Sequence, residues 1–317
     1  MANQELKYKD GVIPVTSGHE DDANIYARNY FDEIHVEERL IDSGSADLHV
    51  RIFNKEFSSP IVMPAFSHLN KNNSERKPME EYALAAKELN ILNFVGMEDN
   101  TTFLDILKGN PNTVRIIKPF EDKSKVLDEI KTAADNKAFG VGMDIDHSYG
   151  KDGGYDVVDG FKMTRVTSED LKEYISASSL PFFVKGILSV SDAVKARELG
   201  AKAIVVSTHH GRMPYAVEPL RLLPAIRKAV GKDLLIILDG QVFSGYDVYK
   251  SLALGADLVM VGRGILPELI KDGEKGVMTK IQKMNAELKE MMQYTGVKNI
   301  KEFTPSVLYY RGQRMGE

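Results

Sequence analysis

Short apolar runs rich in β-branched residues alternate along the chain with amphipathic stretches of helical period. Such runs predict strands of a parallel sheet, and the stretches between them predict helices that cover it. We expect eight strands, at residues 60–66, 91–97, 113–118, 138–144, 181–185, 203–207, 234–239 and 258–262. Eight strand–helix units that close on themselves form a (β/α)8 TIM barrel, an α/β fold.

Helical patterns flank and separate these strands, and they predict how the chain is divided. Between strands they lie at 79–89, 123–136, 190–199, 219–230 and 246–254, with one before the barrel at 21–30 and one after it at 275–294. We therefore expect a single domain over residues 1–317, with an N-terminal addition to about 55, a barrel core over about 56–270 and a C-terminal helical segment over about 271–317. The glycine-rich connection at 145–167 is either an active-site lid or an ordinary surface loop.

Composition narrows the class of protein. The chain has 317 residues, 41 basic and 46 acidic, giving a net charge of −5 and no basic excess of the kind that nucleic-acid binders carry. It has no cysteine, so disulfides and thiolate chemistry are excluded, and any redox work falls to a bound cofactor. We find neither a signal-peptide core at the start nor an apolar stretch of membrane-spanning length, which favours a cytoplasmic location.

Polar residues gather at the carboxyl ends of the predicted strands, and in a barrel these ends open onto one face. The segment Ser-Thr-His-His-Gly-Arg at 207–212 follows a buried strand and supplies a histidine pair, His209 and His210, that could provide a base, and a carboxylate anchor, Arg212. Asp144 could orient a histidine of this pair, although an aspartate at a strand end is more often a cap. Lys185 could offset developing negative charge, or its ammonium could simply reach solvent.

The last two strands are followed by glycine-rich segments that resemble phosphate-binding elements. Asp239-Gly240 leads into a helix after the seventh strand, and Gly262-Arg263 follows the eighth. Small residues let backbone N–H groups approach an anion, and Arg263 would neutralise its charge.

A metal site is the competing interpretation of the same face. Asp144, Asp146 and His147 beside His209 and His210 could offer oxygen and imidazole ligands to a divalent ion. Two adjacent histidines cannot easily aim at one ion, and no tight ligand motif is present, so we expect no metal.

These motifs together resemble the FMN-dependent α-hydroxy-acid oxidising family, which includes glycolate oxidase, lactate oxidase and mandelate dehydrogenase. The resemblance runs from Ser17-Gly18 to the terminal helix and rests on Val184-Lys185-Gly186, the 207–212 segment, Asp239-Gly240 and the stretch from Ser251 to Arg263. It implies FMN as cofactor and oxidation of an L-2-hydroxy acid to a 2-oxo acid.

The resemblance also implies a role for each matching residue. His209 would be the base, Asp144 its partner, Arg212 the carboxylate anchor and Lys185 the cation against the flavin N1/O2 edge. The other cofactor contacts would be Pro64, Ala65, Ser207, Asp239, Gly240, Gly262 and Arg263. Relatives of this fold often form tetramers, so the resemblance further implies a homo-oligomer that acts on a small carboxylate. From composition we expect binding to neither nucleic acid nor membrane.

Several positions depart from the family pattern. Pro14 stands where the family has one active-site tyrosine, and Lys118-Pro119-Phe120 replaces the Gln-x-Tyr that holds the second. The strand-four threonine is Gly142, the phosphate-binding arginine is Phe243, and a family glycine is His210. The added Lys118 and His210 favour a substrate with an extra anionic group. The alternatives are a flavin-dependent isomerase or lyase, a metal-dependent lyase or hydrolase, and a catalytically weakened ligand-binding barrel.

Overall fold

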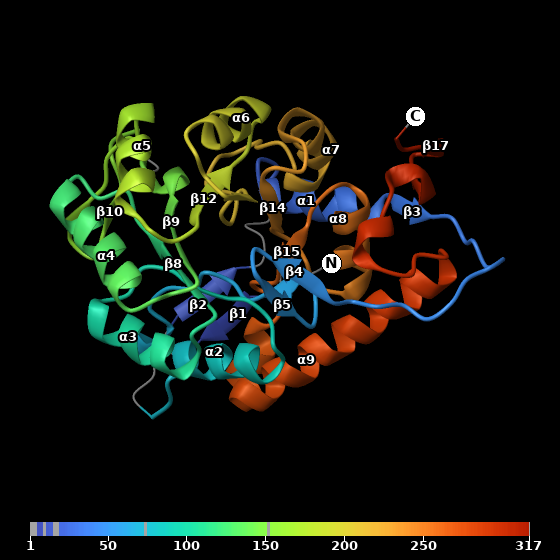
Figure 1. Ribbon diagram of the computed structural model, residues 1–317, viewed down its shortest axis with the longest axis horizontal. Helices are drawn as coiled ribbons and strands as arrows, with labels where there is room; N and C mark the ends of the chain where they lie inside the picture. Colours follow the sequence, from blue (N-terminus) through green and yellow to red (C-terminus); the bar gives the residue numbers. More distant parts are fainter. Residues whose placement is uncertain (1–4, 9–10, 15–18, 73–74, 151–152, 317) are drawn as a thin grey trace.

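Eight parallel strands form a nearly closed barrel at the centre of the computed structural model, which describes residues 5–8, 11–14, 19–72, 75–150 and 153–316 (Figure 1). Around the barrel the strands neighbour one another in the order β6, β15, β14, β13, β12, β9, β8 and β7. The Met63 N–H donates to the Leu92 carbonyl at 2.9 Å and joins β6 to the start of β7. The strands are β6 (Ile61–Val62), β7 (Asn93–Val95), β8 (Thr113–Ile117), β9 (Gly140–Asp144), β12 (Phe182–Ile187), β13 (Ala203–Val206), β14 (Leu235–Asp239) and β15 (Leu258–Met260).

Helices form the outer layer, and most begin at a local capping signal. Thr167 and Ser244 each form a capping box with an aspartate three residues on, which satisfies the first backbone donors of two helices. The outer helices are α2 (Pro78–Glu88), α3 (Asn100–Gly109), α4 (Lys123–Asp135), α5 (Ser168–Ala177), α6 (Val190–Glu198), α7 (Pro219–Val230), α8 (Gly245–Ala253) and α9 (Leu266–Tyr294). The backbone of α9 is non-helical at Gly273, so the predicted helix from 275 is its second part.

Two apolar clusters explain why the strand sequences are almost continuously apolar. One fills the barrel interior and includes Phe94, Val205 and Ile237, and the other lies between the strands and the helices. Strands buried on both faces need apolar residues at successive positions. The eight predicted strands are therefore confirmed.

The remaining elements are additions to the barrel. The hairpin of β4 (Val50–Ile52) and β5 (Lys55–Phe57) places Ile52 and Phe57 in the interior cluster, so it covers the amino-terminal end. The other strands are β1 (Glu5–Tyr8), β2 (Gly11–Pro14), β3 (Ile34–Val36), β10 (Val157–Val158), β11 (Phe161–Lys162), β16 (Leu308–Tyr310) and β17 (Gln313–Arg314). The other helices are α1 (Ala23–Asp32) and the short 3-10 turns η1 (Leu69–Asn72), η2 (Ile145–His147), η3 (Ile300–Glu302) and η4 (Pro305–Val307).

The connection after β9 is folded rather than extended across the surface. It contains η2 and the β10–β11 hairpin, and the backbone of Thr164 donates to the Pro119 carbonyl at 2.8 Å. At the hairpin tip, Asp159 pairs with Lys71 and lies 3.1 Å from His68 Nε2. The hairpin is therefore anchored to the connections that follow β8 and β6.

None of the described helices is both long enough and apolar enough to span a membrane.

Candidate active site

Four predicted site residues, each from a different strand, meet at the carboxyl end of the barrel. Lys118 follows β8, Asp144 ends β9, Lys185 lies in β12 and His209 follows β13. The first three are buried, with 5%, 2% and 4% of their surface exposed. Lys185 Nζ lies 3.1 Å from His209 Nδ1, so the two groups share one rim of the barrel.

Asp144 is the centre of this cluster. Its Oδ2 lies 2.6 Å from Lys118 Nζ, and its Oδ1 lies 3.2 Å from both Lys185 Nζ and His209 Nδ1. Burial favours the neutral carboxyl, but the histidine and the two ammonium groups hold the pKa of Asp144 well below its ordinary value. Asp144 is thus an anion that three groups share.

The two lysines respond to this carboxylate differently. Burial lowers the pKa of Lys118, because the attraction of Asp144 only partly offsets it. Lys185 is also buried, but the neighbouring carboxylates Asp144, Asp146 and Asp239 raise its pKa above the ordinary value. The Lys185 ammonium is therefore a fixed positive charge at the mouth, and it does not reach solvent.

His209 is held in an unusual backbone conformation. Its φ is +45°, and its backbone N–H donates to Ser207 Oγ at 3.0 Å. A left-handed conformation in a residue other than glycine often marks a functional site. His209 Nδ1 lies 2.8 Å from Asp146 Oδ1, closer than to Asp144, and His209 Nε2 lies 3.1 Å from His147 Nε2.

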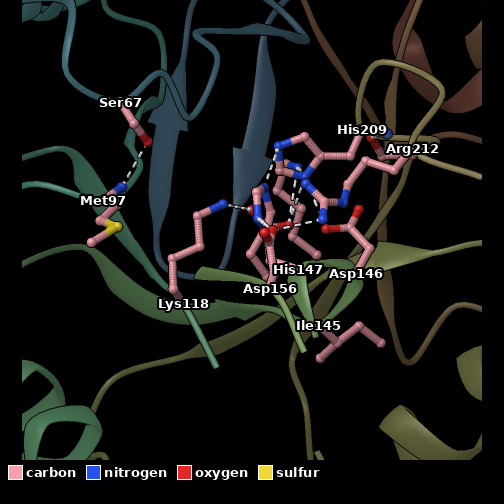
Figure 2. Close-up of polar contacts among 12 residues, drawn as sticks. Ser67, Met97, Lys118, Ile145, Asp146, His147, Asp156, His209 and Arg212 are labelled. Atoms are coloured by element: carbon pink, nitrogen blue, oxygen red, sulfur yellow. Dashed lines mark hydrogen bonds and ion pairs between the residues drawn. The ribbon is translucent and has the colours of Figure 1, made fainter. Parts of the chain in front are cut away.

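The anchor predicted at Arg212 has a partner within the protein. Arg212 Nη2 donates to Asp156 Oδ2 at 2.7 Å and to the Tyr149 carbonyl at 2.7 Å. The same Asp156 oxygen lies 3.1 Å from His147 Nδ1. The contacts run from Lys118 through Asp144 to His209, His147, Asp156 and Arg212, and Figure 2 shows this series.

Asp146, His147 and Asp156 belong to this cluster, yet sequence reasoning gave them no catalytic part. Asp146 and His147 appeared there only as possible metal ligands. Their signal was their position directly after a barrel strand, at the start of a long glycine-containing connection.

The ligand atoms of a possible metal site do converge. One atom each from Asp144, Asp146, His147 and His209 lies within 4.8 Å of the others. However, the ammonium groups of Lys118 and Lys185 already contact both oxygens of Asp144. A divalent cation placed here would meet the fixed positive charge of Lys185 and would have to displace Lys118 from Asp144, so the donor set fits a metal poorly.

A pocket opens beside this cluster, at the ends of β13, β14 and β15. Its lining is rich in glycine and contains one buried cation, and it comprises Ser207, His210, Asp239, Gly240, Gln241, Val242, Phe243, Gly262, Arg263 and Gly264. Ser207 Oγ donates to Asp239 Oδ2 at 2.8 Å. Pro64 lies against Gly262, where an added Cβ would be 3.7 Å from Pro64 Cβ, and Ala65 follows it in the chain.

The residues of this pocket suit the phosphate and ribityl end of a flavin nucleotide. Arg263 is 7% exposed, and burial lowers its pKa although Asp239 and Asp22 oppose this, so an added anion would stabilise its charge. Gln241 Oε1 is a buried acceptor without a hydrogen-bond partner among the described residues, and a ligand hydroxyl could donate to it. Asp239 of this pocket is also one of the carboxylates that raise the pKa of Lys185, so the pocket adjoins the cluster around Asp144.

The departures from the family pattern have local physical reasons. At Gly142, an added Cβ would lie 2.3 Å from the Phe183 carbonyl, so the close approach of β9 and β12 excludes a threonine. Phe120 is buried, and its ring centroid lies 5.5 Å from that of Phe161 in the β10–β11 hairpin. Only the backbone is described at Pro14, and Ser17-Gly18 lies outside the described residues.

One known protein family matches this chain, over about half of its length. A sequence model of FMN-dependent dehydrogenases matches residues 148–310, which include His209, Arg212 and Arg263. The chain is similar to an L-lactate oxidase of Roseobacter sp. (strain GAI101), with 37% identity over 159 residues that cover 50% of this chain and 43% of that protein. A 2-hydroxyacid oxidase of Dictyostelium discoideum is 28% identical over an alignment 317 positions long, gaps included, which covers 89% of this chain and 81% of that protein.

These matches differ in how much of each relative they span. The matched part covers 43% of the Roseobacter enzyme and 34% of an L-lactate oxidase from Lactobacillus jensenii, which is less than half of each. Among solved structures, mandelate oxidase superposes with a TM-score of 0.81 at 22% identity and covers 90% of both chains. At this identity, the structural likeness shows the fold.

Proposed function

Since the chain belongs to the family of FMN-dependent dehydrogenases, we propose that it is an oxidoreductase that converts an L-2-hydroxy acid into a 2-oxo acid. When bound, FMN supplies the acceptor for two electrons and for the hydrogen on the substrate carbon. The protein supplies binding, orientation and the handling of the hydroxyl proton.

Two groups of residues would hold the cofactor. Arg263 and the backbone of Gly240, Gly262 and Asp239 would bind the phosphate and ribityl end, where the pocket is lined by small residues and one buried cation. Lys185 would face the pyrimidine edge of the ring, and Ser207, Pro64 and Ala65 would contact its other parts.

The substrate would bind between the ring and the series of contacts at the barrel mouth. Arg212 would bind the substrate carboxylate through parallel hydrogen bonds, in competition with Asp156. His209 would take the hydroxyl proton at Nε2, because Nδ1 is directed at Asp144 and Asp146, which favour the imidazolium that results.

The observation that carries this proposal is the 3.1 Å contact between Lys185 and His209 beside the pocket of Arg263. It brings a base, a fixed cation and an anion-binding pocket to one face of the barrel. A flavin-dependent isomerase or lyase would need the same cofactor but no net electron transfer.

Anaerobic addition of substrate tests the proposal. Purified protein is expected to be yellow and to lose its flavin absorbance when an L-2-hydroxy acid is added. His209→Ala should slow this bleaching by at least about 10²-fold while leaving flavin binding intact. Unchanged bleaching in this variant would remove His209 from the role of base, and a yellow protein that no 2-hydroxy acid bleaches would favour the isomerase alternative.

The substrate's charge is a separate part of the proposal. Lys118 and His210 led us to expect an extra anionic group on the substrate. Lys118 is paired with Asp144. His210 lines the pocket of Arg263, and burial together with the charge of Arg263 holds the pKa of His210 well below its ordinary value, so His210 offers no positive charge to such a group. A higher kcat/KM for a dianionic 2-hydroxy acid than for lactate would support this expectation, and the opposite order would contradict it.

We further propose that the 317 residues form one cytoplasmic domain that assembles as a homotetramer, as the family resemblance implies. Light scattering of the purified protein should then give about four times the chain mass of 35.4 kDa. A mass of one chain would contradict the assembly.

A further inference from the structure

The pocket of Arg263 is also lined by a neutral side chain whose hydrogen bonds are incomplete. Gln241 follows β14, is 4% exposed and belongs to the lining of this pocket. Its backbone is left-handed, with a φ of +58°, and its carbonyl accepts a hydrogen bond from Arg28 Nη1 at 2.7 Å. Its side-chain Oε1 has no hydrogen-bond partner among the described residues. A buried acceptor in this state costs free energy that a donor from a ligand would recover.

The partners of Asn24 fix which end of the Gln241 amide is unpartnered. Asn24 lies in α1 and is 5% exposed. Its Oδ1 accepts a hydrogen bond from Arg263 Nη2 at 2.7 Å, and a guanidinium has donors only. Its Nδ2 donates to Asp22 Oδ1 at 2.8 Å and to the His210 carbonyl at 3.0 Å. Because a backbone carbonyl can only accept, the Asn24 amide has one possible orientation.

The orientation of the Gln241 amide follows from that of Asn24. Gln241 Nε2 donates to Asn24 Oδ1 at 2.9 Å. Turning the Gln241 amide by half a turn would bring two amide oxygens into contact, and neither carries a hydrogen to donate. The nitrogen of Gln241 therefore faces Asn24, and the atom that is left for a ligand is the oxygen. Gln241 offers an acceptor and not a donor.

An acceptor and a cation in one pocket bind different chemical groups. The Arg263 guanidinium attracts an anion such as a phosphate. The Gln241 oxygen repels the oxygens of a phosphate and binds a hydroxyl that can donate to it. The ribityl chain of a flavin nucleotide carries such hydroxyls next to the phosphate, so one ligand can satisfy both residues.

We propose that Gln241 is a cofactor-binding residue that accepts a hydrogen bond from a ribityl hydroxyl of the flavin through Oε1. The pocket would then recognise the ribityl chain independently of the phosphate. This inference rests on the proposed function, which requires FMN, and the resemblance to the family gave Gln241 no role.

Three flavins separate these contributions in binding to the stripped protein, measured by fluorescence titration. Riboflavin lacks the phosphate of FMN, and lumiflavin lacks the whole ribityl chain. Gln241→Met keeps the side-chain length but removes the acceptor, so it should weaken FMN and riboflavin by about tenfold each and leave lumiflavin unchanged. Arg263→Met should weaken FMN alone. Gln282→Met, at an exposed position of α9, is the matched control and should change none of the three affinities.

The possible results separate this proposal from the proposed function. Unchanged riboflavin binding in Gln241→Met would overturn the proposal, because water would then satisfy Oε1. A loss confined to FMN would also overturn it, since the amide would then act on the phosphate. In either case, a wild-type protein that binds FMN and is bleached by a 2-hydroxy acid would keep its proposed function. A wild type that binds no flavin would overturn both.

Deoxyriboflavins, each without one ribityl hydroxyl, test the same contact in the unaltered protein. One of them should bind the wild type about tenfold more weakly than riboflavin does, and this loss should disappear in Gln241→Met, because the two changes remove the same hydrogen bond. If every deoxyriboflavin binds the wild type as tightly as riboflavin, or if the loss persists in Gln241→Met, Gln241 does not accept a ribityl hydroxyl.

Discussion

The side chain at position 243 is expected to limit how tightly the phosphate of FMN is bound. Phe243 lines the pocket of Arg263, where the family resemblance places an arginine, and its carbonyl accepts a hydrogen bond from Lys280 at 2.8 Å. Phe243→Arg should tighten FMN binding by at least about tenfold, because a charged hydrogen bond is worth about 1.5–3 kcal/mol. Fluorescence titration of the stripped protein with FMN measures this change.

Two controls isolate the phosphate in that titration. Riboflavin lacks the phosphate, so its affinity should not change in Phe243→Arg. Tyr246→Arg places the same charge on the exposed start of α8 and should leave FMN binding unchanged. An equal gain for FMN and riboflavin would mean that position 243 does not face the phosphate.

A buried carboxyl after β7 makes stability depend on pH. Glu98 is 8% exposed and accepts a hydrogen bond from the His68 backbone N–H. Burial raises the pKa of Glu98 from its ordinary 4.5 to about 7. Between these values the folded protein binds more protons than the unfolded chain, so stability falls as pH rises from about 4.5 to 7.

Removing this charge should remove the pH dependence. Glu98→Gln is expected to match the wild type near pH 4 and to exceed its free energy of unfolding by up to about 3 kcal/mol at pH 8. Guanidinium unfolding at the two pH values measures the difference. Glu88→Gln, at an exposed position of α2, is the control. The same pH dependence in Glu98→Gln and the wild type would contradict this account.

At the scale of elements, the base and the tip of the β10–β11 hairpin are held to the barrel by different kinds of contact. Its base is held by backbone contacts to the connection after β8, whereas its tip is held by the side-chain contacts of Asp159 with Lys71 and His68. Asp159→Asn removes the charge from the tip. Because an exposed ion pair is worth at most about 1 kcal/mol, amide hydrogens at 157–162 should exchange up to about fivefold faster.

Hydrogen exchange followed by mass spectrometry can measure this opening. Asp135→Asn on α4 is the matched control, since Asp135 is also an exposed carboxylate paired with a lysine, Lys131. It should leave exchange in the hairpin unchanged. If Asp159→Asn also leaves it unchanged, the tip contacts do not hold the hairpin in place.

The sequence predicted the barrel well because each strand is buried on both faces and is therefore a short apolar run. It also predicted that the side chains at the strand ends lie on one face of the barrel, because the carboxyl ends of barrel strands share that face. These side chains are Asp144, Lys185, Ser207 and His209. The β10–β11 hairpin could not be predicted, since its strands are two residues each and largely exposed. Its short strands carry no alternating pattern that would distinguish them from a loop.

The position of the hairpin explains which contacts of the site escaped prediction. His147 and Asp156 are nine residues apart, and the fold of their connection alone brings Asp156 between His147 and Arg212. Local sequence gives no signal for such a contact. Lys118 was predicted as a cation for the substrate, but its pairing with Asp144 depends on the neighbouring register of β8 and β9.

At the scale of the whole molecule, bound FMN should join parts of the chain that are far apart in sequence. The pocket takes residues from the ends of β13, β14 and β15, and Asn24 of α1 accepts hydrogen bonds from both Arg263 and Gln241. A ligand that binds only the folded state at 100 times its Kd adds about 2.7 kcal/mol to the free energy of unfolding. Stripping FMN should therefore lower the Tm by about 5 °C.

Thermal unfolding of stripped and reconstituted protein checks this dependence and separates it from a metal effect. Riboflavin should restore less of the Tm than FMN, because Arg263 would have no phosphate to bind. A chelator such as EDTA should leave the Tm unchanged, since Lys118 and Lys185 already neutralise the carboxylate at the centre of the site. If EDTA lowers the Tm and FMN does not change it, the metal alternative would replace the flavin assignment.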